Sequence, residues 1–409
     1  MTKLEYKQAF EYDSNNEVIG FTQRTKMRNN TFAYNISDMG AWYSITIKHG
    51  GKTIELFDSL KLLPFSVKKI GESFGTKHKK LDMEYTGYRY AGCEITEEEQ
   101  RYIANDVLVI KEALEIMFNE GHTGITIGSC CLNEFKKLTG KEEYKGLYPD
   151  LYQIPIDENL YHSPTVGDYI HNSYRGGWCY LARGKENRVY HNGTTADVNS
   201  LYPSMMSSES GNAYPTGTPE FWKGNFIPDE ALKPHRYYFI RICTRFYIKK
   251  YKLPFVQLKN TSRYKPTEML ITSDVRSPKD GKLYTTYIGL DGKPHDTRVT
   301  MTLTQTDYEL LKEHYELVDF EILDGCWFYA YTGVFDVYID KYKKIKIEST
   351  GAKRELAKLF LNNLYGKMAA SMNSSFKVAV LNEDKSIGFR EVRQQDKTPG
   401  YIAIGSAIT

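Results

Sequence analysis

The stretch "RYYFIRICTRFYIKK", residues 236–250, constrains the fold of this chain more than any other feature of the sequence. Apolar and polar side chains alternate with a period of two over more than ten residues, which is the pattern of a β-strand running from the edge of a sheet into its core. The surrounding composition, from about residue 208 to residue 330, also favours strands and loops. This part of the chain is therefore predicted to be β-rich.

Other segments predict helices and hairpins. The clearest helix is "TEEEQRYIANDVLVIKEALEIMFNEG", in which Thr96 and Glu99 can form a capping box and Gly121 ends the helix. A shorter helix is expected within "CCLNEFKKLTG" and an amphipathic one over residues 351–372. The segments 41–60 and "FKVAVLNEDKSIGFREVR" are each predicted to be hairpins, the first turning at His49-Gly50-Gly51. Residues 140–165 are turn-rich and are expected to form a linker.

The bulk composition is that of a folded, soluble protein. The chain has 409 residues, of which 41% are hydrophobic and 26% charged, enough for two or three domains. It holds no apolar run of about 18 residues, so we expect no membrane span. The polar N-terminus is unlike a signal peptide, and the six cysteines show no metal-like spacing. These features predict reduced thiols and a cytoplasmic protein.

The charge distribution is more informative than the net charge of +3. Basic clusters interleaved with aromatic or apolar residues occur at 67–80, 247–252 and 340–347. Lysine and arginine heads can meet phosphates while aromatic rings pack on bases, so the clusters are compatible with nucleic-acid binding. Each of them is equally compatible with a solvated charged face. The 33 tyrosines suit any extended polar binding surface.

The segment "TTADVNSLYPSMM", residues 194–206, places a single carboxylate before a sharp turn. We expect Asp197 to end a short buried strand, where a metal and a phosphate can approach it. Val198 would offer its backbone carbonyl to Mg²⁺, and the helix that begins after Ser200 would present free N–H groups to a polyphosphate. The alternative is a simple turn capped by an aspartate.

The segment "KLFLNNLYG" places Lys358, Asn362 and Tyr365 at i, i+4 and i+7, on one stripe of a helix. The lysine can neutralise a leaving pyrophosphate, and the tyrosine can pack on an incoming base. Leu356, Leu359 and Leu364 belong to the rest of the circumference, which is expected to be buried. The alternative is an ordinary amphipathic helix with incidental polar residues.

Taken together, these motifs resemble those of family B DNA polymerases. "DVNSLYPSMM" and "KLFLNNLYGKMA" resemble the first and second polymerase motifs. "SYRGGW" and "LFDSLKLLPFSVKKI" are similar to elements of the protein-primed branch, found in small tailed phages and linear plasmids. Independent motifs in a fixed order multiply their specificity. The resemblance implies an α/β (α+β) fold, with a partial RNase H-like 3′–5′ exonuclease domain, then an incomplete palm and fingers domain with a β-rich insertion.

The resemblance also implies roles for the residues of the polymerase motifs. Asp197, with Val198, would bind the two catalytic Mg²⁺ ions, for which Mn²⁺ is an alternative. Tyr202 would exclude ribonucleotides by contact with the sugar, and Lys358 would act on the phosphates of the incoming dNTP. The residues implied to bind the nucleotide are Val198, Ser200, Leu201, Tyr202, Lys346, Arg354, Lys358, Asn362, Tyr365 and Gly366.

Further partners follow from the same resemblance. Tyr174, Arg175, Gly176 and Gly177 match an element that contacts the template and coordinates synthesis with proofreading. The insertion would bind a priming (terminal) protein, and residues from 371 onward match a hairpin that supports processivity and strand displacement. The expected partners are thus the DNA template and primer strand, dNTPs and the priming protein, and no membrane.

The first third of the chain resembles the latter part of the exonuclease domain. Tyr102 and Asp106 match the tyrosine that orients the attacking water and a metal-binding aspartate, and Lys80 matches a lysine that assists the reaction. The residues implied to hold the single-stranded 3′ end are Ser59, Leu60 and Phe65. Without the resemblance, Tyr102 and Asp106 would be taken as an ordinary pair on a helix surface.

Two departures from the family pattern limit what the 409 residues are expected to do alone. The Asp-x-Glu motif of the exonuclease is expected upstream of residue 1, because Asp82-Met83-Glu84 falls after the Ser-Leu element rather than before it. The Tyr-x-Asp-Thr-Asp motif, with the second catalytic aspartate, does not occur in the sequence. Losing it is expected to lower phosphoryl transfer by roughly 10³-fold or more. Proofreading by the chain alone is not expected.

Three functional hypotheses remain open at this point. The first is a DNA-directed DNA polymerase, active when a second chain supplies the remaining palm and thumb. The second is a non-catalytic DNA- or primer-protein-binding fragment of a split or decayed polymerase, and the third a metal nuclease built on Asp106. The expected domains are an exonuclease-like part (1–125), a linker with the template element (126–190), a palm motif (191–209), the insertion (210–330), fingers helices (331–370) and a hairpin with the start of the remaining palm (371–409).

Overall fold

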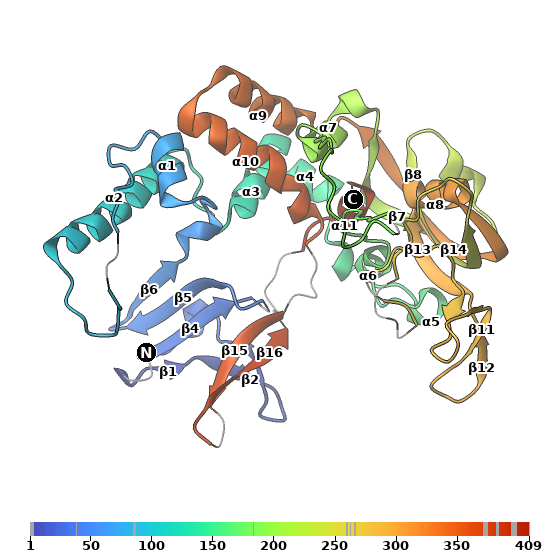
Figure 1. Ribbon diagram of the computed structural model, residues 1–409, viewed down its shortest axis with the longest axis horizontal. Coiled ribbons are helices and arrows are strands. Elements are labelled where there is room, and N and C mark those ends of the chain that lie inside the picture. Colours follow the sequence, from blue (N-terminus) through green and yellow to red (C-terminus); the bar gives the residue numbers. More distant parts are fainter. Residues whose placement is uncertain are drawn as a thin grey trace. The chain divides into compact units, whose positions relative to one another are not determined.

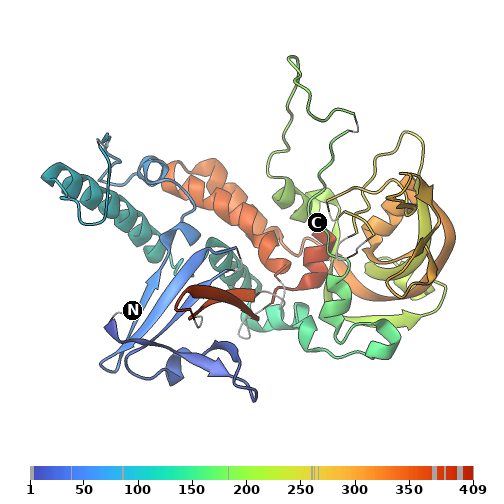
Figure 2. The same cartoon turned by 60° about the horizontal axis from the view of Figure 1, so that its bottom comes forward.

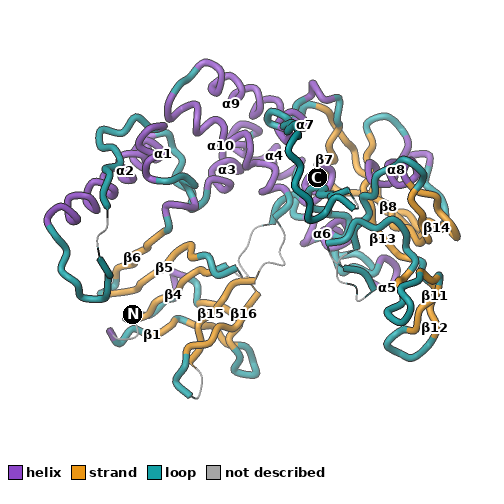
Figure 3. The backbone as a smooth tube through the Cα atoms, viewed as in Figure 1, coloured by secondary structure: helices purple, strands orange, loops and turns teal. Residues whose placement is uncertain are grey.

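The protein is described by a computed structural model, which divides into two compact units (Figures 1 and 3). Unit 1 comprises residues 1–139, 337–367 and 371–398, and unit 2 comprises residues 140–336, 368–370 and 399–409. The structure describes residues 4–37, 39–84, 87–182, 184–258, 261, 263–265, 267–370, 375–381, 384–393 and 399–408. None of the described helices combines the length and apolarity that a membrane crossing requires.

Unit 1 contains a four-stranded sheet in the order β1-β4-β5-β6. Its strands are β1 (Lys7–Gln8), β4 (Thr31–Ile36), β5 (Trp42–His49) and β6 (Lys52–Phe57), and only the β1–β4 pair is parallel. Gly50 and Gly51 turn the chain between β5 and β6 with φ of +54° and +76°, a conformation that glycine adopts without strain. The predicted hairpin at 41–60 is confirmed. A small hairpin, β2 (Phe10–Tyr12) with β3 (Val18–Phe21), precedes β4.

Five helices complete the main body of unit 1 (Figure 1). They are α1 (Val67–Ser73), α2 (Glu97–Asn119), α3 (Ile127–Thr139), α9 (Asp336–Glu348) and α10 (Gly351–Met368). Thr96 and Glu99 form the predicted capping box at the start of α2, since each side chain bonds the other's backbone N–H. Helix α10 buries Leu356 and Leu364 as predicted, whereas Leu359, expected to be buried as well, is half-buried. The carbonyl of Phe360 accepts a hydrogen bond of 2.9 Å from Tyr338 of α9.

The predicted C-terminal hairpin is confirmed as β15 (Ser375–Leu381) and β16 (Ile387–Arg393). It packs on the sheet of unit 1, far away in sequence, as Figure 2 shows. Phe376 and Val378 join the buried cluster of Phe32 and Tyr34, and the Tyr34 hydroxyl accepts a hydrogen bond of 2.6 Å from the backbone N–H of Ala379. Hydrophobic burial thus ties this hairpin to the strands near the N-terminus.

Unit 2 is built around an antiparallel sheet in the order β13-β8-β14-β7. Its strands are β7 (Ala213–Lys223), β8 (Arg236–Ile248), β13 (Val299–Thr304) and β14 (Tyr315–Thr332), with helix α8 (Gln305–His314) between the last two. Strand β8 is the predicted strand at 236–250, and its side chains alternate between buried and half-buried from Ile240 to Tyr247. It is a central strand with neighbours on both sides, so its long apolar face lies in the core.

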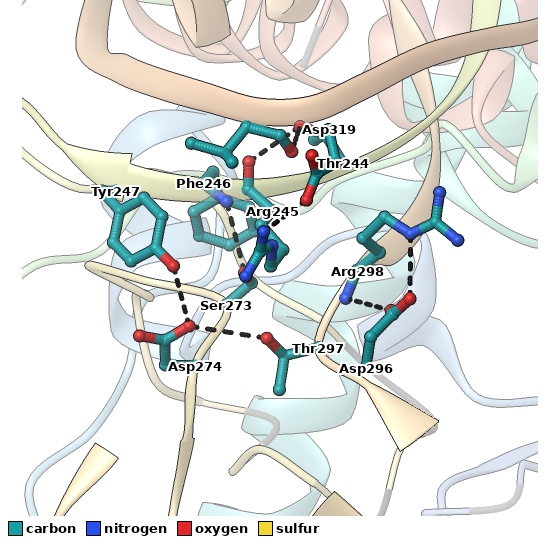
Figure 4. Close-up of polar contacts among 11 residues, drawn as sticks. Thr244, Arg245, Phe246, Tyr247, Ser273, Asp274, Asp296, Thr297, Arg298 and Asp319 are labelled. Atoms are coloured by element: carbon teal, nitrogen blue, oxygen red, sulfur yellow. Dashed lines mark hydrogen bonds and ion pairs between the residues drawn. The ribbon is translucent and has the colours of Figure 1, made fainter. Parts of the chain in front are cut away.

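Two short hairpins are attached to one end of β8 by polar contacts (Figure 4). They are β9 (Val275–Arg276) with β10 (Leu283–Tyr284), and β11 (Thr286–Ile288) with β12 (Pro294–Asp296). Asp274 accepts hydrogen bonds from Tyr247 at 3.1 Å and from Thr297 at 3.4 Å, and Ser273 accepts one from the backbone N–H of Phe246 at 3.2 Å. Arg245 is ion-paired with Asp319, on the irregular part of β14.

The expectation of a linker at residues 140–165 is wrong. This segment and the residues after it form α4 (Lys141–Leu147), α5 (Glu158–Tyr161) and α6 (Val166–His171), which are packed into unit 2. Leu151 and Tyr169 are almost completely buried. The Pro, Asp and Gly residues that suggested a linker are separated by apolar residues such as these, which hold the segment in the core. Helix α11 (Ile402–Ile408) contacts both α6 and β7.

The remaining elements are α7 (Leu201–Met206) and the 3₁₀ helices η2 (Arg24–Lys26), η3 (Ser59–Lys61), η4 (Leu151–Gln153), η5 (Ser208–Ser210) and η6 (Asp229–Leu232).

The two units do not follow the six domains expected from the sequence. Helices α9 and α10, expected to be fingers, group with the exonuclease-like residues of unit 1, and so does the hairpin of β15 and β16. The functional boundaries within each unit remain predictions.

A buried ion pair fastens α6 to the sheet of unit 2. Asp324 of β14 is completely buried, and the guanidinium of Arg241 on β8 reaches both of its oxygens, with Nε at 3.0 Å from Oδ1 and 3.2 Å from Oδ2. Tyr169 of α6 donates a hydrogen bond of 2.9 Å to Asp324 Oδ1. The carboxylate therefore has partners from a neighbouring strand and from the helix, as a buried charge requires.

We expect the Arg241→Met substitution to destabilise unit 2 by about 3–5 kcal/mol, because it leaves the Asp324 charge buried without its counter-ion. The matched control is Arg245→Met on the same strand, whose partner Asp319 is exposed and whose loss should cost about 0–1 kcal/mol. Urea unfolding followed by tryptophan fluorescence, in a Trp42→Phe background, reports on unit 2 because the other three tryptophans lie there. Equal losses for the two variants would contradict the assignment.

Candidate active site

The carboxylate of Asp197 lies in an exposed loop and not at the end of a strand, so the predicted short strand is wrong. Residues 191–199 have no regular secondary structure, and Val198 is 59% exposed. In the described part of the chain no strand pairs with residues 194–197, so the β-forming threonines there have no ladder to join. Ser200 adopts a left-handed conformation with φ of +55°, and α7 begins directly after it, as the predicted turn and helix require.

Helix α7 brings Tyr202 close to the Tyr-Arg-Gly-Gly element. Burial raises the pKa of the Tyr174 hydroxyl, and the neighbouring Tyr202 raises it further. The Tyr174 ring also stacks on His171, with ring centroids 6.0 Å apart and planes at 15°. The structure therefore places the tyrosine implied in sugar selection beside the tyrosine implied in template contact.

Arg175 anchors the same element to the sheet of unit 2. Its guanidinium donates hydrogen bonds to the carbonyls of Asn172 at 3.1 Å and Thr302 at 3.2 Å. Burial lowers the pKa of Arg175, and the nearby Asp307 opposes this shift. Gly176 and Gly177 are exposed, and a Cβ at either would meet no atom within 4 Å. Packing against the described residues therefore does not require glycine at these two positions. A ligand that approaches the backbone closely would require it.

The helical stripe of Lys358, Asn362 and Tyr365 forms on α10 as predicted. Asn362 is exposed, and Lys358 and Tyr365 are half-buried. Lys358 is held by Glu355, whose carboxylate accepts a hydrogen bond of 2.7 Å from Nζ. This bond is the main cause of the lowered pKa of Glu355.

The other residues implied at the nucleotide lie near the two ends of this stripe. Arg354 donates a hydrogen bond of 2.6 Å to the backbone carbonyl of Lys346, which joins the end of α9 to the start of α10. Gly366 is exposed, with open space where a Cβ would stand. All of these residues belong to unit 1, whereas Asp197 and Tyr202 belong to unit 2.

Lys80, Tyr102 and Asp106, the predicted exonuclease residues, form one cluster in unit 1. Lys80 Nζ donates hydrogen bonds to the Tyr102 hydroxyl and to Asp106 Oδ2, and lies 3.9 Å from the centre of the Tyr102 ring. Desolvation lowers the pKa of Lys80, but these two bonds outweigh it, so the net shift is upward. The second oxygen of Asp106, Oδ1, is buried without a hydrogen-bond partner among the described residues. An oxygen in this position can accept a ligand.

Ser59, Leu60 and Phe65 lie on η3 and the turn that follows it. Asp58 caps this short helix, accepting a hydrogen bond of 3.0 Å from the backbone N–H of Leu60. The Leu60 side chain is 53% exposed, and Phe65 is half-buried. Both can contact a ligand without rearrangement of the core.

The sequence reasoning missed the partners of the functional side chains. Glu355, the carboxylate that holds Lys358, stands three residues before it, a spacing that predicts a contact on a helix. His171 stands three residues before Tyr174 and stacks on its ring. Asp307 borders the Tyr-Arg-Gly-Gly element from a distant position, and only the folded chain shows this neighbour.

A scan of protein families matches residues 89–409 to DNA polymerase type B, organellar and viral. The DNA polymerase of Bacillus phage M2 is 36% identical over 399 residues, which are 96% of this chain and 63% of that protein. The match to the family model extends over most of the sequence, and so does the relative. The chain belongs to this family of DNA polymerases. This confirms the resemblance that the motifs indicated.

Solved structures agree with the membership in the type B family. The chain is similar to phi29 DNA polymerase in an orthorhombic crystal form, with a TM-score of 0.76 and 34% identity over 95% of this chain and 62% of that one. It is also similar to phi29 DNA polymerase complexed with primer-template DNA and incoming nucleotide substrates, with a TM-score of 0.73 at 34% identity. The type B chain described here thus spans slightly less than two thirds of the length of these polymerases.

We expect unit 2 of this type B polymerase to lose stability in acid because of His171. Burial lowers the pKa of its ring, and the charge of Asp168 opposes this only in part, so the folded state favours the neutral imidazole. The stabilising contribution is present above the unfolded pKa of about 6.5 and is lost as the pH falls through the lower folded value.

The measurement is urea unfolding of the Trp42→Phe background between about pH 5 and pH 7.5, the window in which histidine titrates. The His171→Gln variant should show a weaker pH dependence than its parent. The burial-lowered pKa of His122, in unit 1, is unchanged between the two proteins, so the difference isolates His171. The same pH dependence in both proteins would contradict the expectation.

Proposed function

We propose that this chain acts in template-dependent addition of dNTPs to DNA, as part of a protein-primed DNA polymerase. The observation that supports this most strongly is the 36% identity to a phage DNA polymerase along 96% of the chain. The chain spans 63% of that relative, so the activity, substrates and partners of the whole polymerase are part of the proposal. The proposal gives each cluster described above a role in binding DNA or nucleotide.

Tyr202 and the residues before it would receive the sugar and phosphates of the incoming nucleotide. Ser200 turns the chain into α7, which would begin beneath this position. The phenol ring of Tyr202 would exclude a 2′-hydroxyl by its size. Asp197 and Val198 would stand at the phosphates, where their exposed loop leaves room for an ion.

The ion implied by the family is Mg²⁺ or Mn²⁺, and the described residues fit it only in part. They contain no group of three or more His, Cys, Asp or Glu side chains that could hold a metal. A two-metal site needs at least two carboxylates in contact with the ions. Asp197 supplies one carboxylate and Val198 one carbonyl. The set is incomplete within these residues, and the remaining ligands would come from a further segment or a second chain.

The stripe on α10 would bind the triphosphate and base. Lys358 would exchange its bond with Glu355 for one with a phosphate, which carries more charge. Arg354 and Lys346 would add positive charge at one end of the stripe. The base would contact Asn362, Tyr365 and the backbone of Gly366, which has no side chain.

The remaining elements would organise the DNA and the priming protein. The Tyr-Arg-Gly-Gly element would hold the template strand, and the insertion at 210–330 would bind the priming protein. The hairpin of β15 and β16 would support processivity and strand displacement. Lys80, Tyr102 and Asp106, with Ser59, Leu60 and Phe65, would bind a 3′ end, and Asp106 Oδ1 is the oxygen left open for a metal.

A second function, DNA or primer-protein binding without catalysis, is favoured by one observation. Asp197 lies in an exposed loop instead of on a strand that would fix its carboxylate. A carboxylate that is not held rigidly is a poor anchor for phosphoryl transfer, which depends on positioning.

Primer extension separates these two functions. The purified chain is assayed with primer-template DNA, dNTPs and Mg²⁺, alone and together with a polypeptide that carries the Tyr-x-Asp-Thr-Asp motif. We expect extension in the complemented reaction, and an Asp197→Ala loss of about 10³-fold or more, because one metal ligand is removed. DNA binding by Asp197→Ala should be nearly unchanged. DNA binding without extension in any reaction would favour the non-catalytic function.

Glu355→Gln is expected to bind a fluorescent dNTP about two- to five-fold more tightly, because Lys358 is released from its carboxylate. Lys358→Ala should weaken the same binding by about ten-fold or more. Glu134→Gln is the matched control: it removes one negative charge in the same unit, where Glu134 pairs with Lys341. If both glutamate variants changed nucleotide affinity equally, the effect would come from net charge and not from Lys358.

A further inference from the structure

A cavity of about 350 Å³ lies in unit 2 between the Tyr-Arg-Gly-Gly element and α8. Its walls are mostly apolar and include Trp178, Phe255, Met269 and Leu310. Trp178 is 51% exposed, and its indole N–H already donates a hydrogen bond of 2.9 Å to the carbonyl of Pro254. The indole also stacks on Tyr180, with ring centroids 5.8 Å apart and planes at 15°. The ring is thus fixed by its polar edge and by one face, and the exposed remainder is where a further ring could stack.

Polar groups border the apolar walls of this cavity. Arg175, Asp307 and Gln257 line it, so hydrogen-bond donors and acceptors both face the space. Burial raises the pKa of the Asp307 carboxyl, and the charge of Arg175 lowers it in part. An apolar cavity with a few polar groups and a perturbed carboxyl is typical of a site for a flat, partly polar ligand.

A basic turn, residues 249–252, adjoins the cavity. The backbone N–H of Lys249 donates a hydrogen bond of 2.9 Å to the carbonyl of His314, which also lines the cavity. Lys252 is paired with Glu313, and Lys249 Nζ donates a hydrogen bond of 2.6 Å to the carbonyl of Lys312. Neither Lys249 nor Lys250 forms an ion pair with any residue that the structure describes. Tyr251, between Lys250 and Lys252, is 91% exposed. This is one of the basic clusters with interleaved aromatics noted in the sequence, and the polymerase motifs give it no role.

We propose that this cavity receives one unstacked base of single-stranded DNA, with the adjoining phosphates against Lys249 and Lys250. Gly176 of the template element forms part of its lining, so a strand held by that element passes the opening. The base would stack on Trp178 and present its polar edge to Arg175, Gln257 and Asp307. The inference deepens the proposed template binding, on which it rests, by naming a site for a base.

Two features favour a nucleic acid over an apolar side chain of a priming protein. Lys249 and Lys250 lie on the turn that adjoins the cavity and have no carboxylate partner among the described residues, so phosphates complement their charge. An apolar side chain gains nothing from that charge. The combination of an exposed indole face with polar groups at its edge also matches the way single-stranded DNA is bound, by stacking and charge together. The priming protein becomes the alternative that the experiment has to exclude.

The test measures binding of the full 409-residue chain to a fluorescein-labelled oligothymidylate of about 12 nucleotides, within the site sizes of single-strand binders. EDTA is present and dNTPs are omitted, so the result does not depend on polymerase activity. Trp178→Ala should weaken binding by about 5- to 50-fold, and Trp178→Phe should restore most of it. Leu310→Trp, which fills the cavity without changing charge, should weaken binding like Trp178→Ala.

Two further measurements separate the base from the phosphates. Wild-type protein should prefer oligothymidylate over an abasic strand of the same length, and Trp178→Ala should lose this preference. The double variant Lys249→Gln, Lys250→Gln should lower the slope of log affinity against log salt by about 1.4. The double variant Lys279→Gln, Lys282→Gln removes the same charge from another exposed part of unit 2 and should leave the slope unchanged.

Unchanged binding of oligothymidylate by Trp178→Ala and Leu310→Trp would overturn the proposal. If these variants lost binding of a priming protein instead, the cavity would belong to that partner. If the wild-type chain bound oligothymidylate with this pattern but gave no extension even in the complemented reaction, the base site would stand and only the polymerase proposal would be contradicted.

Discussion

The buried contact between Arg241 and Asp324 is the interaction on which the arrangement of unit 2 depends. It joins the two central strands, β8 and β14, and through Tyr169 it holds α6 against them. The Tyr-Arg-Gly-Gly element begins only three residues after α6 ends, so the contact that holds α6 also determines where this element begins. A buried carboxylate is stable only when its hydrogen-bond partners are correctly placed. Asp324 therefore fixes the position of α6, and with it the position of the surface loop that follows α6.

Local patterns in the sequence were sufficient to predict most elements. The capping box of Thr96 and Glu99, the Gly50-Gly51 turn and the alternation along β8 each depend on residues close together in the chain, and each forms as expected. The segment at 140–165 failed because turn residues dominate its composition. Leu151 is almost completely buried, and Tyr169 in the helix that follows contacts Phe221 and Asp324 on distant strands. Such contacts leave no local pattern.

The candidate site shows the same division. The stripe on α10 could be predicted because residues at this spacing share one face of any helix. The cluster of Lys80, Tyr102 and Asp106 could be predicted only from the resemblance to the polymerase family, and the three side chains do meet. Asp197 could not be placed, since a strand exists only where another strand pairs with it and the 194–197 segment has no described partner. Glu355, Asp307 and His171 were missed because a sequence motif contains the groups that meet the ligand and not the groups that hold them.

The side chain of Arg175 connects the Tyr-Arg-Gly-Gly element to the β-rich segment at 210–330. Its guanidinium bonds the carbonyl of Thr302 on β13, interacts with the carboxyl of Asp307 on α8 and lines the apolar cavity beside Trp178. The position of the Tyr-Arg-Gly-Gly element therefore depends on β13 and α8 through this one side chain, which also forms part of the cavity wall.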